Sequence, residues 1–171
     1  MEADAHQRPK QPATPLAGPY GHPFHPILVT VPIGAWVASF VFDIASQAAG
    51  EEAVFTKGAF WLIGIGIVGA LAAAVFGLLD LLVIPRRTRA YRVGVTHLVL
   101  NLAVVALFVV GFLIRRTQLD DDESVEALPI VISAVALAVL GVSGWLGGKL
   151  AYRYGVRVVD EATQAEGFVP R

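Results

Sequence analysis

Two of the four histidines in this chain stand in the segment His-Pro-Phe-His-Pro, as His22 and His25, where a long apolar run begins. Asp80 and His97 interrupt later apolar runs. Ionisable side chains are costly inside a membrane and often mark functional sites there. Imidazole and carboxylate groups are suitable ligands for a transition-metal ion, and two histidines at similar depth suit a b-type haem. Histidines titrate near neutral pH, so they can also pass protons to Asp80.

The prolines indicate which backbone presents the first two histidines. A residue that precedes proline avoids the helical region, so His22 and His25 are expected in extended or polyproline II conformation. Positions i and i+3 of such a strut project to the same side. In the alternative interpretation, Pro26 occupies the first helical position and the histidines only lie at the membrane interface.

Composition places these residues in a membrane protein. The 171 residues are 56% hydrophobic and 16% charged, with a mean hydropathy of +0.65, whereas roughly a quarter of residues are charged in soluble proteins. The absence of cysteine excludes disulfides, thiolate zinc sites, covalently attached haem and thiolate-held iron–sulfur clusters. The net charge of -1 and the lack of a recognisable nucleic-acid motif argue against nucleic-acid binding.

Four apolar runs predict the elements that position the polar residues. Each run is near the roughly 20 residues that a spanning helix needs, and the predicted helices cover about 26–45, 58–84, 93–114 and 127–148. We therefore expect an all-α integral membrane four-helix bundle over residues 21–158, between a flexible tail at 1–20 and a C-terminal tail at 159–171. Small residues predict close helix packing, and they are Gly66, Ala70, Ala73, Gly77, Gly141, Gly144 and Gly148.

Basic residues predict the orientation of the bundle. Ten of the thirteen Lys and Arg residues fall in the two tails and the second loop, so both termini are expected to be cytoplasmic. The acidic run at 120–123 would then face outward.

This topology brings His22, His25, Asp80 and His97 to the inner membrane face. Four supporting residues complete the candidate set. Asn101 follows His97 at i+4 on one helix face, while Arg86 and Arg89 in the second loop could pair with Asp80. Asp43 lies toward the outer end of the first helix, where a solvated or capping acid is the simplest interpretation.

The same segments resemble a family of bacterial predicted membrane proteins, classed as a domain of unknown function, with four spanning helices and a His-Pro-x-His-Pro opening. The matching segments are 22–34, 77–85, 94–101 and 147–158. The resemblance implies the four-helix fold and signature positions for His22, His25, Asp80 and His97. Some members resemble partners or fusions of Rieske-type redox proteins, which favours electron transfer. The family often has histidine where this chain has Lys149 or Tyr154, which weakens a haem site with a C-terminal ligand.

The leading hypothesis is a multi-pass protein of the bacterial inner membrane with a redox-associated role. In it, His22, His25, His97 and Asp80 bind a b-type haem or a transition-metal ion. The expected partners are the lipid bilayer, a redox protein and further copies of the chain. One alternative is a non-catalytic scaffold or assembly subunit in which these residues form a buried polar lock. Another is a proton-coupled carrier of small solutes, which would require several copies to enclose a path.

Overall fold

Four long helical segments make up the protein. The structure is a computed structural model that describes residues 6–48, 50–117, 119 and 124–169. The first segment consists of α2 (Phe24–Leu28) and α3 (Thr30–Ala45), and it is followed by α4 (Glu52–Leu82), α5 (Arg89–Arg116) and α6 (Ala127–Gly148). A π-helical turn, η3 (Lys149–Arg153), extends α6. All four segments are long and apolar enough to cross a membrane, which confirms the predicted all-α membrane architecture.

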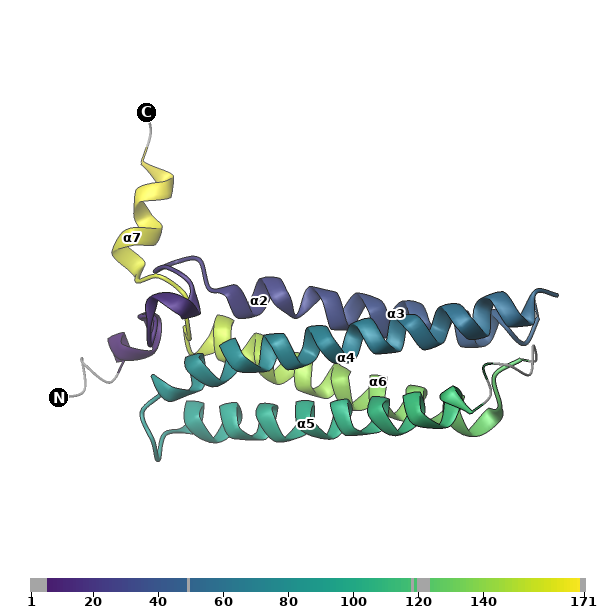
Figure 1. Ribbon diagram of the computed structural model, residues 1–171. Helices are drawn as coiled ribbons and strands as arrows, with labels where there is room; N and C mark the ends of the chain where they lie inside the picture. The colour runs from purple at the N-terminus through teal and green to yellow at the C-terminus, as the bar shows by residue number, and fades with distance from the viewer. Residues whose placement is uncertain (1–5, 49, 118, 120–123, 170–171) are drawn as a thin grey trace.

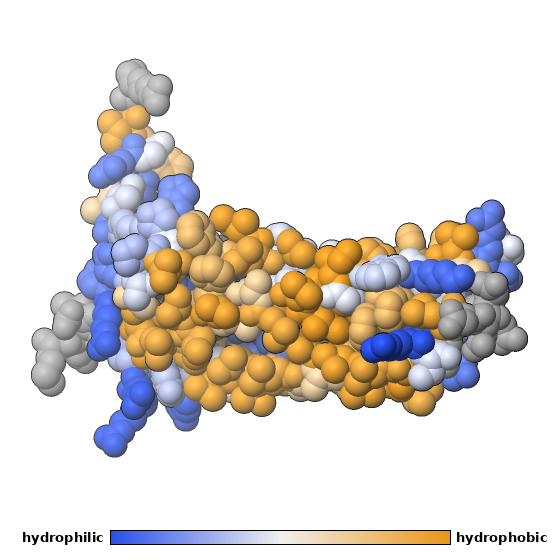
Figure 2. Space-filling view, in the orientation of Figure 1, coloured by the Kyte–Doolittle hydropathy of each residue, from blue (hydrophilic) through white to orange (hydrophobic). Residues whose placement is uncertain are grey.

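The long helices run side by side, and the described terminal segments lie at one end of the bundle (Figure 1). We call this the terminal end; it also carries the loop between α4 and α5. At the opposite end α3 ends, α4 begins, α5 ends and α6 begins. Hydrophobic residues cover the length of the visible helices, and hydrophilic residues gather toward the ends (Figure 2). Both tails therefore share one end, as predicted, while the side of the membrane that this end faces stays a prediction.

The middle of the bundle is a packed apolar core. Trp36 of α3 stacks on Phe108 of α5, with ring centroids 4.3 Å apart and planes inclined by 10°. Ile63, Val104 and Ala136 complete this buried cluster. Gly66 makes the arrangement possible, because a Cβ atom at this position would collide with the Trp36 indole. The small-residue stripe predicted on the second helix thus serves close packing, as expected.

The glycines predicted to pack on the fourth helix, which include Gly141 and Gly144, do not contact a neighbouring helix. An added Cβ atom at Gly141 or Gly144 would meet nothing within 4 Å. Both residues are exposed on the outer face of α6, so the prediction that they pack against a neighbouring helix is wrong. In the same region, Gly147 faces the His97 ring, and an added Cβ atom at Gly148 would lie 3.9 Å from Tyr152 Cδ2 of the same helical segment.

The helix boundaries also differ from the predicted ones. The second helix begins at Glu52, ahead of Gly58, and the third extends to Arg116. His25 lies in the first turn of α2, so the prediction of a non-helical His25 is wrong. A proline after it is compatible with this turn, since the first amide groups of a helix have no intrahelical acceptor. The acidic run at 120–123 lies outside the described residues.

The tails contain short helices of their own. They are η1 (Arg8–Lys10), η2 (Pro15–Ala17), α7 (Glu161–Ala165) and η4 (Glu166–Phe168). The Arg157 amide donates to the Pro9 carbonyl at 2.9 Å. The described part of the N-terminal tail therefore packs against the C-terminal segment at the terminal end.

Candidate functional site

His25 fastens the first segment to α4. Its Nδ1 atom lies 2.9 Å from the Ala73 carbonyl oxygen. The ring sits against Gly77, where an added Cβ atom would lie 2.8 Å from His25 Cε1. A carbonyl only accepts hydrogen bonds, so Nδ1 carries a hydrogen, and in the neutral imidazole the lone pair is then on Nε2. Glycine at position 77, one turn after Ala73, thus fixes the place and the tautomer of this ring.

His97 fastens α5 to α6 in the same manner. Its Nδ1 atom lies 2.8 Å from the Ser143 carbonyl oxygen and 3.0 Å from the Ser143 hydroxyl. The ring sits against Gly147, whose added Cβ atom would lie 3.1 Å from Cε1. Asn101 Nδ2 donates both to His97 Nε2 at 3.1 Å and to the His97 carbonyl at 2.9 Å. The predicted i+4 partnership of these two residues is therefore present.

The two imidazoles meet where the helix pairs α2–α4 and α5–α6 come together. Their ring centroids are 6.4 Å apart and the planes are nearly perpendicular, at 89°. Each ring has its Nδ1 atom against a carbonyl of the neighbouring helix. Two histidines separated by more than 70 positions thus form one contact, which we call the histidine pair.

The other two members of the predicted cluster do not join this pair. His22 is exposed, outside α2. Asp80 pairs with Arg157, whose Nε atom lies 2.9 Å from Asp80 Oδ1. Within the described residues, no group of three or more histidine, aspartate or glutamate side chains is placed to hold a metal ion.

The sequence predicted Arg86 or Arg89 as the partner of Asp80, and this prediction is wrong. The partner is Arg157 of the C-terminal segment. After the π-helical turn, the chain reverses through left-handed backbone at Gly155 and Arg157, with φ of 66° and 61°. Arg157 then enters the bundle end, and its Nη2 atom also donates to the carbonyls of Ala17 and Gly18. One buried arginine thus joins α4 to both tails.

Further contacts between the tails form what we call the tail clasp. The Tyr20 hydroxyl donates to Asp160 Oδ2 at 2.9 Å and accepts from the Asp160 amide. Hydrogen bonds from the Thr163 amide and from Tyr20 lower the pKa of Asp160. Lys10, which is buried, lies 3.5 Å from Glu161. The clasp covers the end of the bundle nearest to the histidine pair.

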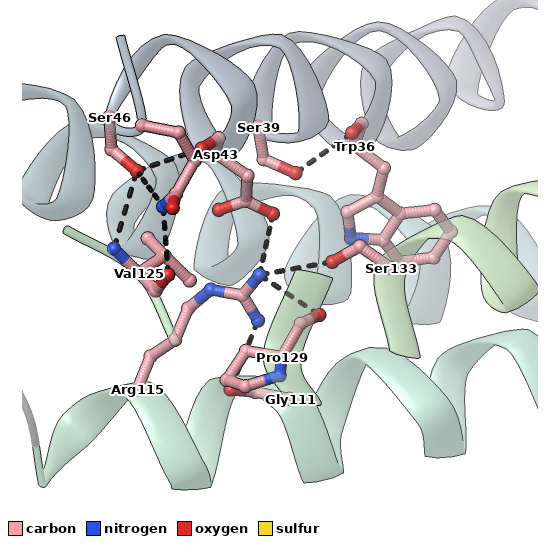
Figure 3. A network of polar contacts seen from close by, with 10 residues as sticks. Trp36, Ser39, Asp43, Ser46, Gly111, Arg115, Val125, Pro129 and Ser133 are labelled. Carbon is pink, nitrogen blue, oxygen red and sulfur yellow. Dashed lines mark hydrogen bonds and ion pairs between the residues drawn. The ribbon is translucent and has the colours of Figure 1, made fainter. Parts of the chain in front are cut away.

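A second polar network lies near the opposite end (Figure 3). Arg115 of α5 and Asp43 of α3 are both 0% exposed, and Arg115 Nη2 lies 2.6 Å from Asp43 Oδ2. Arg115 also donates to the carbonyls of Gly111 and Pro129 and to the Ser133 hydroxyl. The network therefore links α3, α5 and α6 through one guanidinium group.

This network corrects two sequence interpretations. Asp43 is a buried ion-pair partner rather than a solvated or capping acid. Arg115, which the orientation count placed in a loop, lies inside α5. The available signal was periodicity, because Arg115 continues the buried stripe of Val104, Phe108 and Gly111 at helical spacing.

Comparison with known proteins identifies a family but no characterised relative. Neither the curated proteins nor the solved structures contain a match. The family described as "Predicted membrane protein (DUF2231)" matches residues 21–160. This range contains the four helices, the histidine pair and both buried ion pairs. The chain therefore belongs to the DUF2231 family of predicted membrane proteins.

Proposed function

We propose that His25 and His97 are the axial ligands of a haem in a membrane protein with a redox-associated role. The observation that carries the proposal is the histidine pair itself. Each Nδ1–H donates to a backbone carbonyl, which leaves Nε2 as the ligating nitrogen. Histidines that bind metals commonly hold their second nitrogen in this way, since the hydrogen bond fixes the ring orientation and increases its basicity.

The number of histidines favours haem over a bare metal ion. A zinc site usually takes three or four protein ligands, and the described residues bring only two histidines together. A haem supplies four nitrogens of its own, so the protein needs to contribute only the axial ligands. The donor set of this chain therefore fits haem better than the alternative transition-metal ion.

The two histidines would hold the haem from different helices. His25 belongs to α2 and His97 to α5, and their ring centroids are 6.4 Å apart. Asn101 bonds His97 Nε2, yet it also bonds the His97 carbonyl, so it can release the ring nitrogen and keep one hydrogen bond.

Absorption spectroscopy of the purified protein tests this proposal. We expect a haem spectrum after expression with sufficient haem, or after addition of haemin to the purified protein. His25→Ala and His97→Ala should each remove the spectrum of the doubly ligated iron. His22→Ala is the matched control, because His22 is exposed, and it should leave the spectrum unchanged. No haem spectrum under either condition, or one that survives both ligand substitutions, would refute the proposal.

A structural role is the second candidate, and a specific pattern favours it. Four ionisable residues of the helices each have a partner on a different element: His25 with Ala73, His97 with Ser143, Asp80 with Arg157 and Asp43 with Arg115. This pattern suits a membrane scaffold or assembly subunit whose polar contacts lock the helices. The scaffold interpretation predicts that His25→Ala and His97→Ala destabilise a protein that never contained haem.

A further inference from the structure

A groove lies at the terminal end of α6, on the exposed side of the helix and its π-helical extension. Its lining residues are Trp145, Gly148, Lys149, Tyr152 and Arg153, and it is an open depression of about 400 Å³. Trp145 is 67% exposed and Tyr152 is 92% exposed. Large aromatic side chains with this exposure are typical of the layer in which lipid headgroups meet the hydrocarbon core.

The backbone explains why a hollow forms here. Lining positions 145, 148, 149, 152 and 153 recur at helical spacing, so they share one face. Gly148 provides no side chain to fill the floor. In the π-helical turn the Tyr154 amide bonds the Lys149 carbonyl at 3.2 Å, which widens the helix at this point. Such π-helical turns are rare and frequently occur at functional sites.

The charge of the groove is positive. Its two ionisable residues are Lys149 and Arg153, and the remaining lining residues are uncharged. Lys149 Nζ lies 5.3 Å from the centroid of the Trp145 ring and 6.0 Å from that of Tyr154. Within the described part of the chain, neither cation forms an ion pair with a carboxylate. The two cations therefore remain available to an external anion.

We propose that this groove binds the phosphate headgroup of an anionic phospholipid. Lys149 and Arg153 hold the phosphate, and Trp145 and Tyr152 flank the glycerol region. An acyl chain then lies along α6 over Gly141 and Gly144, where no side chain is within 4 Å of either position. Basic residues near the end of a membrane helix attract anionic headgroups electrostatically. The proposal is independent of the histidine pair, which lies on other faces of the helices.

Native mass spectrometry of the full chain in non-ionic detergent tests the site. Dioleoyl phosphatidylglycerol is the anionic probe and dioleoyl phosphatidylcholine the zwitterionic one. We expect phosphatidylglycerol to bind more tightly, and the double variant K149Q/R153Q to weaken that binding by roughly tenfold or more. The matched control R86Q/R89Q removes two exposed cations from the same end of the bundle without touching the groove, and it should change binding less than about twofold.

Three results would overturn the assignment. Equal binding of the two lipids would show that the phosphate charge is not recognised. Unchanged affinity in K149Q/R153Q, with an unaltered far-ultraviolet circular dichroism spectrum, would place any lipid elsewhere. Displacement of phosphatidylglycerol by millimolar inorganic phosphate would indicate a site for free phosphate rather than for a membrane lipid.

Discussion

The buried pair of Asp43 and Arg115 should be the most sensitive point of the fold. Both side chains are fully buried, so removal of one partner leaves an uncompensated charge, which typically costs about 3–5 kcal/mol of unfolding free energy. Arg115→Met leaves the Asp43 carboxylate without its cation and should reach this range. Asp43→Asn should cost less, about 2–3 kcal/mol, because Arg115 keeps its bonds to Gly111, Pro129 and Ser133.

The double variant D43N/R115M measures the coupling between these two residues. It removes both charges, so its destabilisation should be smaller than the sum of the single effects by about 2 kcal/mol or more. Equilibrium unfolding by sodium dodecyl sulfate in mixed micelles, followed by circular dichroism, provides the free energies. Arg116→Met is the matched control, since Arg116 is the exposed neighbour in sequence, and should stay within about 0.5 kcal/mol of the parent protein. Additive effects of the two single substitutions would refute the reasoning.

Two further predictions concern the terminal end. Gly77→Ala should displace the His25 ring and lower the free energy of unfolding by about 1–3 kcal/mol through overpacking. Gly141→Ala meets no neighbour and should be neutral or slightly stabilising. Chemical unfolding of both variants checks this contrast, and equal effects would contradict the packing account. The tail clasp should loosen in acid. The pKa of Asp160 is lowered by its Thr163 and Tyr20 hydrogen bonds, so its stabilising contribution is present above the ordinary aspartate pKa and is lost as the pH falls through the lowered value. Amide exchange around residues 157–165, referenced to each amide's intrinsic rate, should show this loss of protection. Asp160→Asn should reduce the pH dependence to the part that Glu161 contributes, since a backbone hydrogen bond and Lys10 lower the pKa of Glu161 as well. An unchanged pH dependence in that variant would exclude Asp160 as a source.

The elements of the fold could be predicted because their signal is local. A run of apolar residues of membrane-spanning length specifies a helix without reference to any other part of the chain. The stripe that includes Gly66 and Gly77 likewise follows from helical periodicity, and these positions do receive Trp36 and His25.

The partners in the candidate site could not be predicted in this way. Asp80 is 77 positions from Arg157, and the contact depends on a chain reversal with left-handed backbone at an arginine. Such a conformation is uncommon outside glycine and asparagine, so the residue types around Arg157 do not predict it. Arg86 and Arg89 were closer in sequence, but they lie exposed in and after the loop. The identity of an ion-pair partner depends on how the chain folds back in the tertiary structure, and the hydropathy of the sequence does not predict this.

The position of the polar groups along the bundle bears on the carrier alternative. His25 and Asp43 are separated by about 27 Å of helix, at 1.5 Å per residue. Between them lies the buried cluster of Trp36, Ile63, Val104, Phe108 and Ala136, which offers a proton or polar solute little to bind in the described core. A conducting path would therefore have to form between copies of the chain. A single copy keeps its two polar regions separate, with the histidine pair toward the terminal end and the Asp43–Arg115 network toward the opposite end.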